Sequence, residues 1–220
     1  MSDSSQSNLF LNGEGDAWFF RNSESAYKSQ TTFDISFICS TLEQFKGKIS
    51  RILEIGCGGG AKVGTLSEYF DAEGHGIDPS KVAIESAKSR LGASERKMHF
   101  QTGLATDLPF ENNSFDLVFF GFCLYLVPPA EIFKAVTEAD RVLKQGGFLA
   151  ILDFDYGQLK VNPYKHAEGI NSYKNNYSQF FTTSGYFHQV SKWSFSHFGD
   201  SFILDKDERL SIEVLYKEMI

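Results

Sequence analysis

The chain has 220 residues, a length that fits one domain with an ordinary hydrophobic core. Its 21 Lys and Arg residues face 28 Asp and Glu residues, and the net charge of −7 disfavours nucleic-acid binding through a broadly basic surface. Three widely spaced cysteines make neither a disulfide framework nor a paired metal motif, so we expect no metal. The polar, acidic N-terminus and the lack of an apolar run of about 20 residues predict a cytoplasmic protein without a membrane partner.

Hydrophobic periodicity predicts helices in the first part of the chain and an alternation of strands and helices from residue 49 onward. The predicted strands are 49–55, 74–77, 98–101, 115–120 and 148–152, separated by helices at 63–70, 80–91 and 130–143. Residues 156–186 show no periodicity, and two strand-like stretches follow at 188–198 and 209–219. The pattern therefore predicts an α/β fold with a doubly wound, Rossmann-like, mostly parallel sheet of seven strands and an antiparallel C-terminal edge hairpin.

The most informative stretch is the glycine-rich turn that follows the first predicted strand. Gly56, Gly58 and Gly60 stand where a strand ends and a helix begins, which is typical of a loop whose backbone touches a ligand. Asp78 ends the second strand, where an acid accepts both hydroxyls of a ribose. Glu54 precedes the turn, where it is suited to hold a cationic amine.

These residues resemble class I S-adenosylmethionine (SAM)-dependent methyltransferases. The first motif of that family, Glu/Asp-x-Gly-x-Gly-x-Gly, is matched from Glu54 to Gly60, and its ribose-binding acid is matched by Asp78. Two later segments, 103–118 and 141–149, are similar to the adenine-side loop with the fourth strand and to the turn before the fifth strand. The resemblance covers about residues 49–155.

The resemblance implies SAM as cofactor, S-adenosylhomocysteine (SAH) as product, and a set of cofactor-binding residues. These are Glu54, Gly56, Cys57, Gly58, Asp78, Pro79, Leu104, Ala105, Thr106 and Gly121, together with Arg21 from an N-terminal lid, which would meet the SAM carboxylate. The chain departs from the family at Leu104, where an acid often stands near the adenine amino group. For Arg21 and its aromatic neighbours the alternative is an anchor that packs against the sheet.

We expect a single domain, 1–220, with four parts: a helical lid (1–48), the SAM-binding core (49–155), a substrate-side insertion (156–186) and C-terminal strands (187–220). The insertion supplies Lys160, Lys165 and Lys174, which would form a cationic pocket for an anionic or sugar-like acceptor. It also holds the catalytic candidates His166 and Tyr173, the former because histidine is the side chain best suited to general-base chemistry near neutral pH. The alternative is a solvated loop without a role in the site.

The acceptor is expected to be a small molecule. The segment after the fourth strand lacks the Asn/Asp-Pro-Pro-Tyr/Phe pattern of enzymes that methylate bases or amides. Residues 13–22 and 162–174 resemble small bacterial methyltransferases of surface-polysaccharide gene clusters, which implies a sugar, sugar-nucleotide or phosphorylated acceptor. His75, His99, His188 and His197 lie in strand-like segments and are interpreted as structural.

Two rival functions remain open. A nicotinamide-dependent oxidoreductase would also use Gly56-x-Gly58-x-x-Ala61, which satisfies the loose dinucleotide fingerprint. A catalytically silent SAM-binding module would keep the cofactor residues and regulate a partner. The sequence leaves the oligomeric state undetermined.

Overall fold

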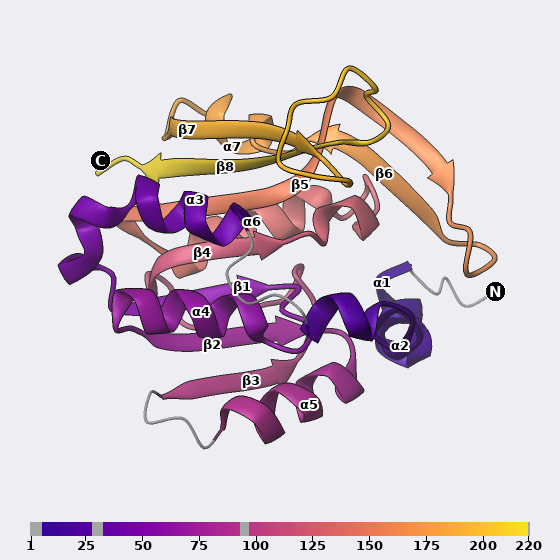
Figure 1. The fold of residues 1–220 in the computed structure, drawn as a ribbon, viewed down its shortest axis with the longest axis horizontal. Helices are drawn as coiled ribbons and strands as arrows, with labels where there is room; N and C mark the ends of the chain where they lie inside the picture. Colours follow the sequence, from indigo (N-terminus) through magenta and orange to yellow (C-terminus); the bar gives the residue numbers. More distant parts are fainter. Residues whose placement is uncertain (1–5, 28–32, 93–96, 220) are drawn as a thin grey trace.

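The computed structural model describes residues 6–27, 33–92 and 97–219, which form a central sheet with helices on both faces (Figure 1). The sheet order is β3-β2-β1-β4-β5-β8-β7, and β6 pairs with β5 outside this path. Neighbours from β3 to β5 are parallel, whereas β8 pairs antiparallel with both β5 and β7. The strands are β1 Arg51–Ile55, β2 Glu73–Asp78, β3 Met98–Thr102, β4 Phe115–Gly121, β5 Leu143–Pro163, β6 Asn171–Asn176, β7 Phe187–Ser196 and β8 Arg209–Lys217. The predicted fold class is confirmed.

Helices precede the sheet and separate its parallel strands. They are α1 Gln6–Leu9, α2 Gly15–Tyr27, α3 Phe33–Thr41, α4 Ala61–Phe70, α5 Lys81–Leu91, α6 Ile132–Val142 and α7 Gln179–Thr182. A π-helical turn, Phe10–Glu14, joins α1 to α2, and 3-10 turns lie at Glu43–Lys48 and Leu124–Leu126. Among the described residues, no helix is long and apolar enough to span a membrane.

The parallel strands are buried on both faces, as their continuous apolar sequences predict. In β4, Leu117 and Phe119 join a core cluster that also holds side chains of α3 and α4. Val118 and Phe120, one position along, join a second cluster with α6. Figure 1 shows the corresponding layers, with α3 and α4 on one side of the sheet and α6 on the other. This two-sided core fixes the strand ends that carry the site.

The insertion differs from the sequence-based expectation, because much of it is regular structure. β5 continues to Pro163, far beyond the predicted end of its strand, and pairs antiparallel with β6 from Lys160↔Lys174 to Pro163↔Asn171. Most residues of this arm after Phe154 are polar and partly or fully exposed. Hydrophobic periodicity therefore gives no signal there, since the pairing rests on backbone hydrogen bonds. β6 adds an eighth strand to the seven predicted.

Candidate active site

A cavity of about 620 Å³ opens where the parallel strands end at their carboxyl termini. Loops after each of four neighbouring strands line it: Glu54–Gly59 from β1, Asp78–Pro79 from β2, Gly103–Thr106 from β3 and Gly121–Cys123 from β4. This is the edge at which open α/β sheets bind their ligands. The volume is in the range of small-molecule sites, about 300–1,000 Å³.

The glycine turn exposes backbone to this cavity. Gly56 has φ +75°, and a Cβ there would lie 2.5 Å from Cβ of Cys123, so a side chain would collide with the next loop. Gly58 has φ +49° and open space where a Cβ would be, and its N–H donates to Asp78 Oδ2 over 2.8 Å. A ligand can therefore approach the backbone of the turn directly.

Asp78 is held in a fixed orientation at the end of β2. Its Oδ1 accepts a hydrogen bond from the N–H of Ser80 (2.9 Å), while Oδ2 accepts from Gly58. Burial raises the Asp78 pKa to about 6, and the two backbone donors oppose that rise. The group is therefore mostly ionised at neutral pH, and each oxygen keeps a lone pair for a hydroxyl donor.

Glu54 is a buried carboxyl group on the floor of the cavity, only 1% exposed. Its Oε2 accepts from the N–H of Val63 (2.9 Å) in the first turn of α4, and within the described residues Oε1 has no hydrogen-bond partner. Burial raises the Glu54 pKa to about 8, against the opposing charge of Lys62. A cationic group in the cavity would favour the ionised form, so the site suits an amine.

Leu104, Ala105 and Thr106 form the part of the cavity wall that follows β3. Asp107, the nearest acid in sequence, is exposed and outside the lining. The family's acid at this edge therefore has no counterpart here. This wall offers an apolar surface and backbone groups to a flat ring.

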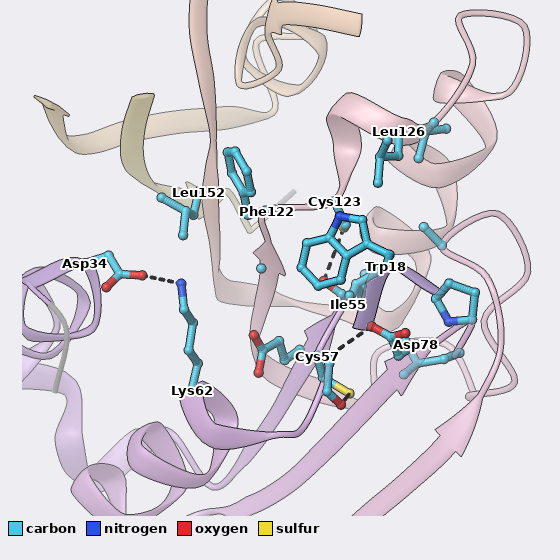
Figure 2. Close-up of a pocket in the computed structure, with 18 of the residues that line it drawn as sticks. Trp18, Asp34, Ile55, Cys57, Lys62, Asp78, Phe122, Cys123, Leu126 and Leu152 are labelled. Atoms are coloured by element: carbon cyan, nitrogen blue, oxygen red, sulfur yellow. Dashed lines mark hydrogen bonds and ion pairs between the residues drawn. The ribbon is translucent and has the colours of Figure 1, made fainter. Parts of the chain in front are cut away.

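Helix α2 lies against the cavity and is tied to α5. Trp18 lines the cavity, and its Nε1 donates to Tyr125 Oη over 3.2 Å. Asp16 Oδ1 accepts from Ser80 Oγ (2.6 Å) and from the N–H of Val82 (3.1 Å) at the start of α5. Figure 2 shows the Trp18 indole lying across the cavity near Asp78.

Arg21 lies elsewhere. Its side chain hydrogen-bonds Glu14 and Tyr164 Oη, the latter over 3.0 Å, and it is not among the cavity-lining residues. The structure therefore does not bring Arg21 to the position expected for a SAM carboxylate ligand. It ties α2 to the loop after β5 instead.

Neither catalytic candidate from the insertion reaches the cavity. His166 is exposed, with its ring edge-on to Tyr164 at 5.3 Å between centroids. Tyr173 is buried at 9% exposure, and its hydroxyl lies 3.5 Å from Gln6 Oε1. Lys160 and Lys174 both bind Asp207. No cationic pocket forms around the cavity from these described side chains.

The cavity also has a wall that the sequence motifs do not indicate. It is mainly apolar and comes from segments far apart in the chain: Phe33, Phe122, Leu126, Val127, Leu152, Phe195, His197 and Leu210. Phe122 has φ +65°, which is unusual for a bulky residue and marks a constrained position directly after β4. The only sequence feature that indicated part of this wall was the position of residues 121–123 directly after a predicted strand.

An ion pair closes one side of the cavity. Lys62 Nζ lies 2.5 Å from Asp34 Oδ2, and both residues line the cavity, opposite Asp78 in Figure 2. Neither residue was singled out from the sequence. The pair joins α3 to the first turn of α4 beside the glycine turn.

One cluster of metal-type ligands occurs among the described residues, at the amino-terminal ends of β2 and β3. Glu73 Oε1 lies 3.1 Å from Nε2 of both His75 and His99. Arg51 Nη2 lies 3.4 Å from the same His75 nitrogen and supplies positive charge beside Glu73. The guanidinium already supplies positive charge to Glu73, so we interpret the cluster as a network of hydrogen bonds and charge among Arg51, Glu73 and the two histidines.

The sheet order, the glycine turn after β1 and the acid at the end of β2 together define the class I SAM-dependent methyltransferase fold. The cofactor of this class is SAM. Asp78, Gly58 and Glu54 fit it, because they offer hydroxyl acceptors, open backbone and a buried carboxyl group with one unpartnered oxygen.

Comparison with known proteins agrees with a methyltransferase fold. Residues 52–147 match a family model described as a methyltransferase domain. A demethylmenaquinone methyltransferase of Staphylococcus epidermidis is 36% identical over 118 residues, which cover 53% of this chain and 47% of that protein. The chain thus spans about half the length of the curated relatives it matches.

Solved structures show the same fold. A SAM-dependent methyltransferase from Clostridium acetobutylicum aligns over 93% of this chain and 99% of that chain, with a TM-score of 0.66 and 10% identity. Another from Methanosarcina mazei aligns over 81% and 97%, with a TM-score of 0.61 and 18% identity. The family assignment made from the sequence motifs is confirmed.

Proposed function

We propose that this protein transfers the methyl group of SAM to a small, largely apolar acceptor. The observation that carries the proposal is one continuous cavity with two different halves. One half presents Glu54, Gly58 and Asp78, and the other is walled by aromatic and aliphatic side chains. The first half suits SAM and the second an acceptor beside it.

Glu54 would hold the amine of SAM, Asp78 its ribose hydroxyls, and residues 104–106 its adenine ring. The bound cofactor supplies a methyl group already activated by its sulfonium. The protein's part is to align the acceptor and to exclude water. Trp18 and Phe122 serve both purposes, since they cover the cavity with apolar surface.

The acceptor class follows from the second half of the cavity. The anionic or sugar-like acceptor expected from the sequence relied on Lys160, Lys165 and Lys174, none of which lines the cavity. The apolar wall favours a planar, weakly polar molecule instead. The Staphylococcus epidermidis relative, named for demethylmenaquinone, supports such an acceptor.

Two measurements, made one after the other, test the proposal. First, SAM or SAH should raise the melting temperature whereas NADH should not; the reverse would favour the oxidoreductase. Second, purified protein with SAM is offered phenols and hydroquinones in one pool and sugar phosphates and sugar nucleotides in another, with mass detection of methylated products. Methylation confined to the sugar pool would refute the apolar acceptor. SAH binding with no methylation in either pool would favour a silent SAM-binding module.

A further inference from the structure

The cavity holds few titratable side chains that are free to take a proton from an acceptor. Glu54 and Asp78 belong to the cofactor half, and Asp34 is paired with Lys62. Burial raises the pKa of the Cys57 and Cys123 thiols, which are therefore protonated at neutral pH. Asp200, at the rim, is exposed, and its Oδ1 accepts a hydrogen bond from Ser201 Oγ (3.5 Å). Among the described lining residues, His197 remains.

His197 follows β7 directly and lies in the apolar wall. Its ring is edge-on to Phe122, with 5.6 Å between centroids, and to Phe154, with 5.4 Å. Within the described part of the chain, neither ring nitrogen has a hydrogen-bond partner, although the backbone N–H donates to the carbonyl oxygen of Glu208. His197 is an exposed residue that lines the cavity and packs against aromatic rings, so its ring nitrogens are accessible to a ligand.

The surroundings keep this imidazole neutral. Burial lowers the His197 pKa, Lys174 adds to this effect, and Glu208 opposes it. A neutral imidazole has one nitrogen that accepts a proton. His197 is thus in its basic form at neutral pH, next to Phe122 at the end of β4.

We propose that His197 is a catalytic base, and that the acceptor is a planar aromatic molecule whose hydroxyl group is methylated. This inference rests on the proposed function and adds to it the acceptor's reacting group and the residue that takes its proton. The acceptor oxygen forms its new bond to the methyl carbon as the carbon–sulfur bond breaks. SAH is released, and the hydroxyl proton passes to His197 and then to water.

A phenol-type hydroxyl explains why a base is present. A phenol has a pKa of about 10, as the tyrosine side chain does, so it is protonated at neutral pH. Removing its proton during transfer makes the oxygen a better nucleophile, and positioned bases typically contribute about 10²–10⁴-fold to a rate. The ring itself would pack between apolar side chains such as Phe122 and Phe195.

The test uses 4-nitrophenol, whose ionised form absorbs visible light, as a probe in protein saturated with SAH. The apparent pKa of the bound probe is measured by absorbance in the wild type, in His197→Gln and in His188→Gln. His188 is an exposed histidine on β7, the strand that His197 follows, and serves as the matched control. His197→Ala provides a second variant at the site, and thermal unfolding with SAH shows that each variant is folded.

We expect a bound-probe pKa lower by about one unit or more in the wild type and in His188→Gln than in either His197 variant, because protonated His197 stabilises the phenolate. Equal values in all proteins would overturn the role of His197. Absence of probe binding to SAH-saturated protein would overturn the phenol-type acceptor. Absence of SAH binding would instead refute the proposed function, which separates the two failures.

A kinetic measurement completes the test with any phenol that the wild type methylates. His197→Gln should lower kcat about a hundredfold or more while SAH affinity stays within about twofold. With a phenol that is already ionised in the assay buffer, the same substitution should lower kcat much less. Equal decreases in kcat for ionised and protonated phenols would indicate a packing role for His197 and contradict base catalysis.

Discussion

Replacing Glu54 by glutamine should stabilise the free protein while weakening its ligand binding. Glu54 is 1% exposed, and burial raises its pKa from 4.5 to about 8. The folded state therefore holds a proton that the unfolded chain releases between these two values. Stability from this group falls as the pH rises from about 4.5 to about 8 and is then constant. Glutamine has no such proton and keeps an oxygen for the N–H of Val63.

The size of the effect follows from the two pKa values of Glu54. At about 1.4 kcal/mol per pKa unit, the gain in unfolding free energy is about 1 kcal/mol at pH 5 and about 3 kcal/mol at pH 7, with a ceiling near 5 kcal/mol. Denaturant unfolding of wild type and Glu54→Gln at pH 5, 7 and 8.5 measures it. Glu68→Gln, at an exposed position on α4, is the control and should change little.

Ligand binding should move in the opposite direction. SAH carries an ammonium group, and losing a charged hydrogen-bond partner costs about 1.5–3 kcal/mol, or more than tenfold in affinity. Calorimetry should also show proton release from wild-type Glu54 on SAH binding below pH 8, and none from this position in the variant. A variant that is less stable than wild type at pH 7 and 8.5, or a stability difference that does not vary with pH, would refute the reasoning.

Three further variants test other parts of the site. Asp78→Asn should weaken SAH binding about tenfold or more by calorimetry, because charge-assisted hydrogen bonds to the ribose are lost; unchanged affinity would contradict its role. Gly121→Ala places a Cβ 2.4 Å from Glu54 Oε1 and should lower the unfolding free energy by about 1–3 kcal/mol. The control Gly157→Ala has open space around its Cβ and should not lower it. Equal decreases would argue against the close approach at Gly121. Asp16→Ala removes the acceptor for Ser80 Oγ and for the N–H of Val82 at the start of α5. It should lower the unfolding free energy by about 1 kcal/mol and weaken SAH binding. An SAH affinity equal to that of the wild type would show that α2 does not shape the cavity.

The cofactor half of the site was predictable because its residues are close to one another in sequence. Glu54 to Gly60 and Asp78 lie at the carboxyl ends of two successive strands, and the rule that parallel strands end at one edge brings them together. The buried strands were equally clear, since their apolar runs are continuous. Phe115, Phe119 and Phe120 are fully buried in β4, which accounts for part of the high phenylalanine content.

The predictions that failed were those that assigned a role to polar residues from their position in the sequence, without knowledge of their partners in the fold. The exposed β5–β6 arm has no apolar face, so its pairing left no trace in the sequence. Lysines within it suggested a cationic pocket for an anionic acceptor, yet Lys160 and Lys174 bind Asp207, more than thirty residues further along the chain. Arg21 similarly had a partner, Tyr164, that only folding supplies.

By itself, the sequence determined the sheet, its two-sided core and the residues that suit SAM, because these depend on local periodicity and on motifs of adjacent residues. The tertiary structure decided the acceptor half of the cavity. Trp18, Phe122 and His197 come from three distant segments and meet only because α2 packs over the strand ends and the β7–β8 connection closes beside β4. The sequence places His197 in a strand-like run, and its position beside an open cavity is one that no local pattern encodes.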